Sequence, residues 1–211
     1  MTDPILTADL EPHIAAFLEL ECEIAKSYYG FVFDTRSDAQ NWQATLFKSG
    51  DCEFGPPWAR LMLIDGKPVG LYAAIPGADL RRIRLVSGMR WLRSQRTVDA
   101  ATRERVRLAA RVSMQPGADD FYLSRIGIVE SMRGHGLGRW LLGRVMAAAG
   151  RAGLQRCVLE VDPENVAAVG LYRRSGFASL GQHAVTDPVS GRRYVSQWMG
   201  RAVAAPSDGG P

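Results

Sequence analysis

The stretch MRGHGLGRWLLGRVM, at 132–146, sets three alternate glycines directly before an apolar helical pattern. The apolar residues that follow the glycines recur with the 3.6-residue period of an α-helix. Apolar segments typical of buried strands lie on both sides, at 121–129 and 156–161. Strand, glycine turn, helix and strand in this order indicate a crossover between two parallel strands. The chain is therefore predicted to build a sheet that contains at least one parallel pair.

The glycines stand where the free backbone N–H groups and the dipole of a helix N-terminus form an anion site suited to a pyrophosphate. A G-x-G-x-x-G dinucleotide fingerprint would need its third glycine where the sequence has Arg139 or Leu141. The P-loop would need a Gly-Lys-Ser or Gly-Lys-Thr ending, which is absent. The pattern that remains is R-x-x-G-x-G, formed by Arg133, Gly134, His135, Gly136, Leu137 and Gly138.

Other segments predict a mixed order of helices and strands. WARLMLID and KPVGLYAAI flank Asp65-Gly66, a dipeptide that tight hairpin turns favour. Gly176 follows a helical pattern as a C-terminal cap would. The further expected elements are helices over 10–29, 38–48 and 164–174, a strand opening at Phe177, and a last strand over 192–199.

Length and composition favour one globular domain over 1–200, followed by a disordered tail at 201–211. No apolar run reaches the roughly 20 residues of a membrane span, and the N-terminus lacks a secretion signal, so a cytoplasmic protein without a membrane partner is expected. Three widely separated cysteines and three scattered histidines indicate reduced thiols and no metal site.

The segment at about 77–119 fits this order least well and is interpreted as an insertion. Ten arginines stand between Arg81 and Arg111, interleaved with apolar residues as in one or two basic amphipathic helices. The segment could form a nucleic-acid surface, a lid that meets phosphates, or a substrate wall. A solvated helical face or a self-association surface is the alternative, which leaves a homodimer open.

Two motifs resemble the GCN5-related N-acetyltransferases. IGIVESMRGHGLGRWLL is similar to the loop of this family that wraps the pyrophosphate of acetyl-coenzyme A (acetyl-CoA), and LEVDPENVAAVGLYRRSGF is similar to its second signature. The resemblance covers roughly 121–178. It implies an α/β fold with a central mixed, mostly antiparallel sheet, helices on both faces, and the insertion between the third and fourth strands. It also implies acetyl-CoA as cosubstrate.

The resemblance assigns cofactor contacts to the residues of the glycine loop and its surroundings. Backbone groups around Ile128 and Val129 would meet the thioester, and Asn165 would bind the pantetheine arm unless it only caps a helix. Arginine side chains near the phosphates would be Arg133, Arg139 and Arg173.

Acyl transfer to an amine also needs proton transfers, because only the free amine attacks and a thiolate leaves. By resemblance Glu160 is the candidate base and Tyr172 the candidate acid. A salt-bridged strand glutamate and a core phenol are the structural alternatives. Asp162, Glu130 and His183 could substitute for Glu160.

The acceptor side is predicted from the expected architecture, in which the first two helices and the last hairpin flank the acetyl group. The candidates are Tyr28, Tyr29, Phe31 and the loop 183–194 with His183. The predicted reaction is acetyl transfer to a primary amine of a small molecule or a protein N-terminus. Acetylation of an amine carried on RNA, such as a charged tRNA, is an alternative that is not favoured, and a non-catalytic acyl-CoA-binding module is another.

Overall fold

The computed structural model describes residues 2–50, 52–93 and 98–204, and it omits the side chains of 90–93. Within these residues a seven-stranded sheet has the order β1-β2-β3-β4-β5-β7-β6. Every neighbouring pair is antiparallel except β4 and β5, which are parallel. The strands are β1 (Ile5–Thr7), β2 (Ala59–Ile64), β3 (Lys67–Pro76), β4 (Asp120–Ile128), β5 (Arg156–Val161), β6 (Ala178–Thr186) and β7 (Arg193–Ala202).

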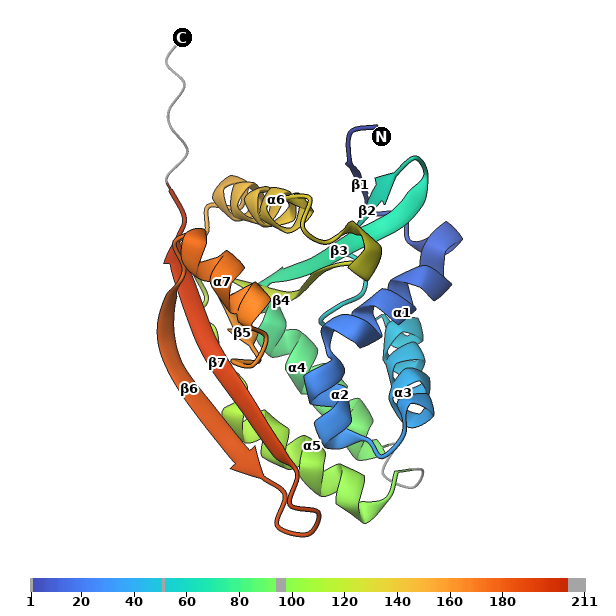
Figure 1. Cartoon of the computed structure of the whole chain (residues 1–211). Helices are drawn as coiled ribbons and strands as arrows, with labels where there is room; N and C mark the ends of the chain where they lie inside the picture. The colour runs from blue at the N-terminus through green and yellow to red at the C-terminus, as the bar shows by residue number, and fades with distance from the viewer. Residues whose placement is uncertain (1, 51, 94–97, 205–211) are drawn as a thin grey trace.

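Helices cover both faces of this sheet (Figure 1). Helices α6 and α7 pack on one face, where the apolar stripe of α6 is buried against β3, β4 and β5. The other face carries α1 to α5 (Figure 1). The α-helices are α1 (Ile14–Ile24), α2 (Lys26–Val32), α3 (Arg36–Ser49), α4 (Gly77–Arg93), α5 (Ala100–Val112), α6 (Leu137–Arg151) and α7 (Val166–Arg174), with short 3-10 turns η1 (Glu11–His13) and η3 (Glu130–Met132). The predicted fold class is confirmed.

The predicted hairpin is confirmed as β2 and β3. Asp65 and Gly66 both have positive φ, 50° and 73°, as the two central residues of a tight hairpin turn require. Strand β1 was not predicted, because three residues are too few to show a period of two.

The first predicted helix, over 10–29, is wrong in its continuity. Helix α1 ends at Ile24 and α2 begins at Lys26, because Ala25 leaves the helical region with φ −92° and ψ 17°. This break lies beside the site described below.

The predicted insertion is helical and lies between β3 and β4, where α4 and α5 occupy the same face of the sheet as α1 and α2 (Figure 1). The prediction that a tail begins at residue 201 is wrong at its start, because β7 continues through Ala202, which pairs with Arg156. Its remaining residues, 205–211, lie outside the described part of the chain.

Candidate active site

Strands β4 and β5 separate at the centre of the molecule. Their parallel register runs from Asp120 opposite Arg156 to Leu123 opposite Leu159 and ends there. The register between β3 and β4 also shifts at this point, so Ser124 forms a bulge. A crevice beyond the carboxyl ends of parallel strands is the usual place for a ligand in open α/β sheets.

The glycine loop borders this crevice and leads into α6. Gly134 and Gly136 have φ values of 82° and 78°, a left-handed conformation that favours glycine. Gly138 serves another purpose: a Cβ there would lie 3.3 Å from Leu171 Cδ2, so the missing side chain lets α6 approach α7. The loop is therefore shaped by backbone handedness at two glycines and by helix packing at the third.

The N-terminus of α6 is open to an anion. No side chain caps it, and its first turn carries no acidic residue. Its first N–H groups therefore lack the usual side-chain acceptor. Arg133 donates from Nε to the Ile128 carbonyl over 3.1 Å, while the exposed Arg139 lines the crevice.

A single cleft of about 1890 Å³ joins the glycine loop to the helices on the other face of the sheet. The cofactor candidates on its wall are Ile128, Arg133, Gly134, Gly136, Leu137, Gly138, Arg139, Asn165 and Tyr172. Val129 and His135 do not line it. Arg173 does not line it either; its neighbour Arg174 does.

Tyr172 lies where the cleft meets the core. Its side chain is buried, its ring lies 5.8 Å from that of Phe177, and it lines the cleft. Its hydroxyl makes no hydrogen bond to another described residue. Burial raises the pKa of this phenol well above its ordinary value, so the group keeps its proton at neutral pH. It is both a core residue and an available proton donor.

Glu160 also lines the cleft, but its carboxylate already has three donors. Oε1 accepts from the Met114 N–H at 2.9 Å and from the Tyr122 hydroxyl at 3.0 Å. Oε2 accepts from the Ser196 hydroxyl at 2.6 Å. The structural alternative predicted a salt bridge at Glu160. The structure instead shows three hydrogen bonds to its carboxylate, which join β4, β5, β7 and the end of the insertion.

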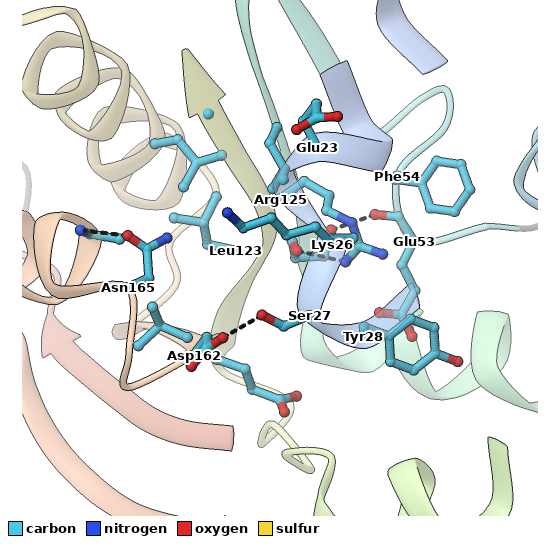
Figure 2. A pocket seen from close by; sticks show the side chains of 18 of the residues that line it. Glu23, Lys26, Ser27, Tyr28, Glu53, Phe54, Leu123, Arg125, Asp162 and Asn165 are labelled. Carbon is cyan, nitrogen blue, oxygen red and sulfur yellow. Dashed lines mark hydrogen bonds between the residues drawn. The ribbon is translucent and has the colours of Figure 1, made fainter. Parts of the chain in front are cut away.

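Asn165 and Asp162 lie on the loop between β5 and α7. Asn165 caps α7, since its Oδ1 accepts from the Ala168 N–H at 3.2 Å. Figure 2 shows the Ser27 hydroxyl of α2 donating to the Asp162 carboxylate, which ties the break between α1 and α2 to this loop. The capping alternative for Asn165 holds, and its amide nitrogen remains available to a ligand.

Comparison with known proteins assigns the family. The model of the Acetyltransferase (GNAT) family matches residues 18–177. The chain belongs to the GNAT family. It is an acetyltransferase that uses acetyl-CoA as acetyl donor. Comparison with curated protein sequences gives no match.

Solved GNAT structures share the fold over nearly the whole chain. A ribosomal-protein-S18-alanine N-acetyltransferase from Escherichia coli is 15% identical, with a TM-score of 0.56 and 99% of each chain covered. An IAA acetyltransferase from Bacillus cereus is 10% identical, with a TM-score of 0.53, covering 95% of this chain and 99% of that one. The protein yncA from Salmonella typhimurium, solved with its cofactor acetyl-CoA, is 15% identical, with a TM-score of 0.54 and coverage of 98% and 99%.

The glycine loop fits the diphosphate of acetyl-CoA in this GNAT protein. Uncapped helix N–H groups and the exposed Arg139 offer donors and positive charge at one end of the cleft. Within the described ranges, no group of three or more His, Cys, Asp or Glu could hold a metal ion, and no helix is long and apolar enough to cross a membrane.

The residues of this GNAT protein that were predicted to contact the acceptor differ in whether they line the cleft. Tyr28 lines the cleft, and so does Tyr29, whose hydroxyl donates to the buried Glu21 at 3.0 Å. Phe31 stacks on Tyr194 with ring centroids 5.6 Å apart and does not line the cleft itself.

The prediction for His183 is wrong. This exposed residue lies on β6, its ring is 4.0 Å from that of Trp198, and it does not line the cleft. Strand β6 forms the edge of the sheet next to β7, away from the parting of β4 and β5. Its position therefore supports neither role predicted for it, the acceptor contact or the substitute base.

Four charged or phenolic residues were not predicted as site residues and lie at the end of the cleft away from the glycine loop, which is called the acceptor end below because the acceptor was predicted to bind there. They are Glu53 before β2, Arg84 on α4, and Tyr122 and Arg125 on β4, and all line the cleft. Arg125 had a signal in the sequence, since an arginine inside the otherwise apolar segment at 121–129 needs a partner or a ligand. Arg84 lies in the arginine-rich segment that could form a substrate wall, but nothing distinguished it from the other arginines there, and Glu53 had no signal.

The arginines of the insertion have divided roles. Arg84 and Arg105 turn inward, with 23% and 3% of their side chains exposed. Arg107 is exposed and pairs with Glu104 at 3.4 Å. Residues of both α4 and α5 line the cleft, as the substrate-wall interpretation expects. The nucleic-acid interpretation stays a prediction.

Proposed function

We propose that this acetyltransferase transfers the acetyl group of acetyl-CoA to a primary amine of a small molecule or a protein N-terminus, by direct attack. The observation that carries the proposal is the continuous cleft, which joins the uncapped N-terminus of α6 to a region lined by polar, charged and apolar side chains on the opposite face of the sheet. A cofactor and an acceptor can enter such a cleft from its two ends and meet where β4 and β5 part.

The attack forms a bond from the amine nitrogen to the thioester carbon and produces an oxyanion, which backbone N–H donors stabilise. The Val129 N–H already donates to the Val69 carbonyl at 2.9 Å. Successive N–H groups of a strand point to opposite edges, so the Ile128 N–H points away from β3. This favours Ile128 over Val129 as the oxyanion donor.

Collapse of the tetrahedral intermediate breaks the bond from carbon to sulfur and releases the coenzyme A thiolate. Tyr172 supplies a proton to that sulfur, which its buried and protonated phenol supports. Glu160 takes the proton lost by the amine, directly or through a water, and its place on the cleft wall supports this role. No bond forms between the protein and the acetyl group.

The first experiment measures the melting temperature with acetyl-CoA and, as controls, with NADH and ATP. Acetyl-CoA at 100 times its dissociation constant should add about 2.7 kcal/mol of apparent stability. Release of free thiol is then measured with a panel of small amines and short peptides. A shift with acetyl-CoA alone, followed by amine-dependent thiol release, supports the proposal. A folded protein without either response contradicts it.

A further inference from the structure

Two opposite charges face the acceptor end of the cleft from neighbouring elements. Arg125 follows the bulge in β4, and Glu53 precedes β2. Figure 2 shows both side chains on the wall of the cleft, while the ammonium group of Lys26 points the other way, toward Asn165. Each is held from behind by another residue, so each presents a fixed charge to a ligand.

Arg125 is fixed by acceptors on its far side. Its Nε donates to Glu21 at 2.6 Å and its Nη1 donates to the Ser124 carbonyl at 2.8 Å. Glu21 is fully buried, lies outside the cleft, and is itself held by Tyr29 and Gln43. No hydrogen bond joins Nη2 of Arg125 to another described residue.

The guanidinium of Arg125 stays charged. Burial by itself lowers the pKa of Arg125, but the Glu21 carboxylate outweighs that effect and raises the pKa well above its ordinary value. The side chain is 17% exposed, and the ring of Phe54 lies 5.5 Å from its Cζ. A carboxylate that reaches Nη2 would meet a preorganised cation with little competing water.

Glu53 is fixed by Arg84. Its Oε1 accepts from Arg84 Nε at 2.8 Å, and its backbone carbonyl accepts from the Ser124 hydroxyl at 2.5 Å. Its Oε2 accepts no hydrogen bond from a described residue. Arg84 is held in turn by the Met114 carbonyl and lies 5.3 Å from the centre of the Tyr122 ring. Glu53 therefore keeps one oxygen for an ammonium group.

Charges of both signs line the acceptor end of the cleft. Among the residues whose side chains the structure describes, cations there include Lys26, Arg84 and Arg125, and carboxylates include Glu23, Glu53 and Asp162. A polycation or a polyanion would meet repulsion as well as attraction there. A ligand that carries one charge of each sign would match the pattern.

We propose that the acceptor is a small amino acid, whose carboxylate binds Arg125 and whose ammonium group binds Glu53 before it loses its proton. This inference rests on the proposed function and narrows it to one substrate class. Residues of α4 and α5 line this end of the cleft.

The test compares acceptors that differ only in the carboxylate. Thiol release is measured with a panel of free amino acids, with their carboxamides, and with the amines that lack the carboxyl carbon. The amino acids should have a kcat/KM on the order of 10²-fold higher, because the neutral analogues leave Arg125 without an anion. Equal or better carboxamides and amines overturn the inference, and so does a peptide N-terminus that exceeds every free amino acid.

A substitution at Arg125 tests whether this residue causes the preference for a carboxylate. In Arg125→Gln the ratio of kcat/KM between amino acid and carboxamide should collapse toward one, whereas Arg111→Gln, an exposed change on α5 outside the cleft, should keep it. Because Arg125→Gln leaves Glu21 buried without its cation, the double variant Glu21→Gln/Arg125→Gln repeats the test with that carboxylate neutralised. An unchanged ratio in a folded variant overturns the inference.

The two proposals fail in different ways. No acetyl-CoA shift, or no thiol release with any amine, refutes the proposed function. If acetyl-CoA raises the melting temperature as expected but the rate of thiol release does not depend on the carboxylate of the acceptor, only the amino acid as acceptor is refuted.

Discussion

The backbone N–H of Met114 donates a hydrogen bond of 2.9 Å to the carboxylate of Glu160. Met114 stands two residues beyond α5, at the end of the insertion, and Glu160 lies on β5 beside the parting of the two parallel strands. The carboxylate that is the candidate base thus also fixes one wall of the cleft. Its two roles can be separated by experiment.

Glu160→Gln keeps an oxygen acceptor and removes the base. If Glu160 takes the proton, kcat/KM should fall about 10²-fold. The curve of kcat/KM against pH should also differ in shape from that of the unsubstituted protein. The melting temperature should fall as well, because three hydrogen bonds to a charged acceptor become weaker. A lower melting temperature with unchanged kinetics would leave Glu160 as a structural anchor only.

Tyr172→Phe removes the hydroxyl of the candidate acid and keeps the ring that packs on Phe177. Turnover should fall about 10²-fold while the affinity for acetyl-CoA changes little, since the phenol acts on the leaving sulfur. Steady-state kinetics with a thermal shift series measure both quantities. Unchanged turnover would assign the proton transfer to another donor.

Gly136→Ala tests the backbone of the cofactor loop. At a φ of 78° an alanine costs about 1–2 kcal/mol, so the free loop should relax to another conformation, and acetyl-CoA binding, which must restore the original one, should weaken roughly 10-fold. Gly143→Ala, inside α6 and with open space where the added Cβ would lie, is the control and should stabilise the protein by up to about 1 kcal/mol. Equal acetyl-CoA affinities in the two variants would refute the assigned role of the loop.

Arg105→Ala tests how the insertion docks. Arg105 is buried, donates from Nε to the Val32 carbonyl at 2.7 Å, and pairs with Asp34 at 3.1 Å. Its loss would also leave the buried Asp187, 3.9 Å from Nη1 of Arg105, without this cation, so the protein should be destabilised by about 3–5 kcal/mol. Arg107→Ala, on the exposed face, should change the stability by less than about 1 kcal/mol. Urea denaturation of both variants gives the comparison, and similar midpoints would contradict it.

Because the thiol of Cys52 is buried, we expect it to lower the free energy of unfolding at alkaline pH. Burial raises its pKa from 9.0 to about 11, so in this window only the unfolded chain releases the proton. The contribution of Cys52 is complete below about pH 9 and is lost at about 1.4 kcal/mol per pH unit as the pH rises toward 11. Urea denaturation at several pH values should therefore show a smaller alkaline loss in Cys52→Ala. Equal losses would contradict the shift.

The conformation of the glycine loop could be predicted from the sequence because its signals are local. Gly134, Gly136 and the helix that follows lie within one short segment, and the backbone conformation that they require is a property of those residues. The hairpin at Asp65-Gly66 was predictable for the same reason. The position of His183 was mispredicted because the local sequence does not determine where β6 lies in the sheet. In the structure β6 is the edge strand next to β7.

The sequence by itself determined the order of elements, the glycine loop and the family to which its motifs belong. Only the tertiary structure decided the acceptor end, where Glu21 meets Arg125 across 104 residues of chain and Glu53 meets Arg84 across 31. Many glutamates and arginines in this sequence could form such pairs, and their local patterns are alike. The packing of α1, α4 and β4 determines which pairs form, because a buried charge is stable only where a side chain of opposite charge lies next to it.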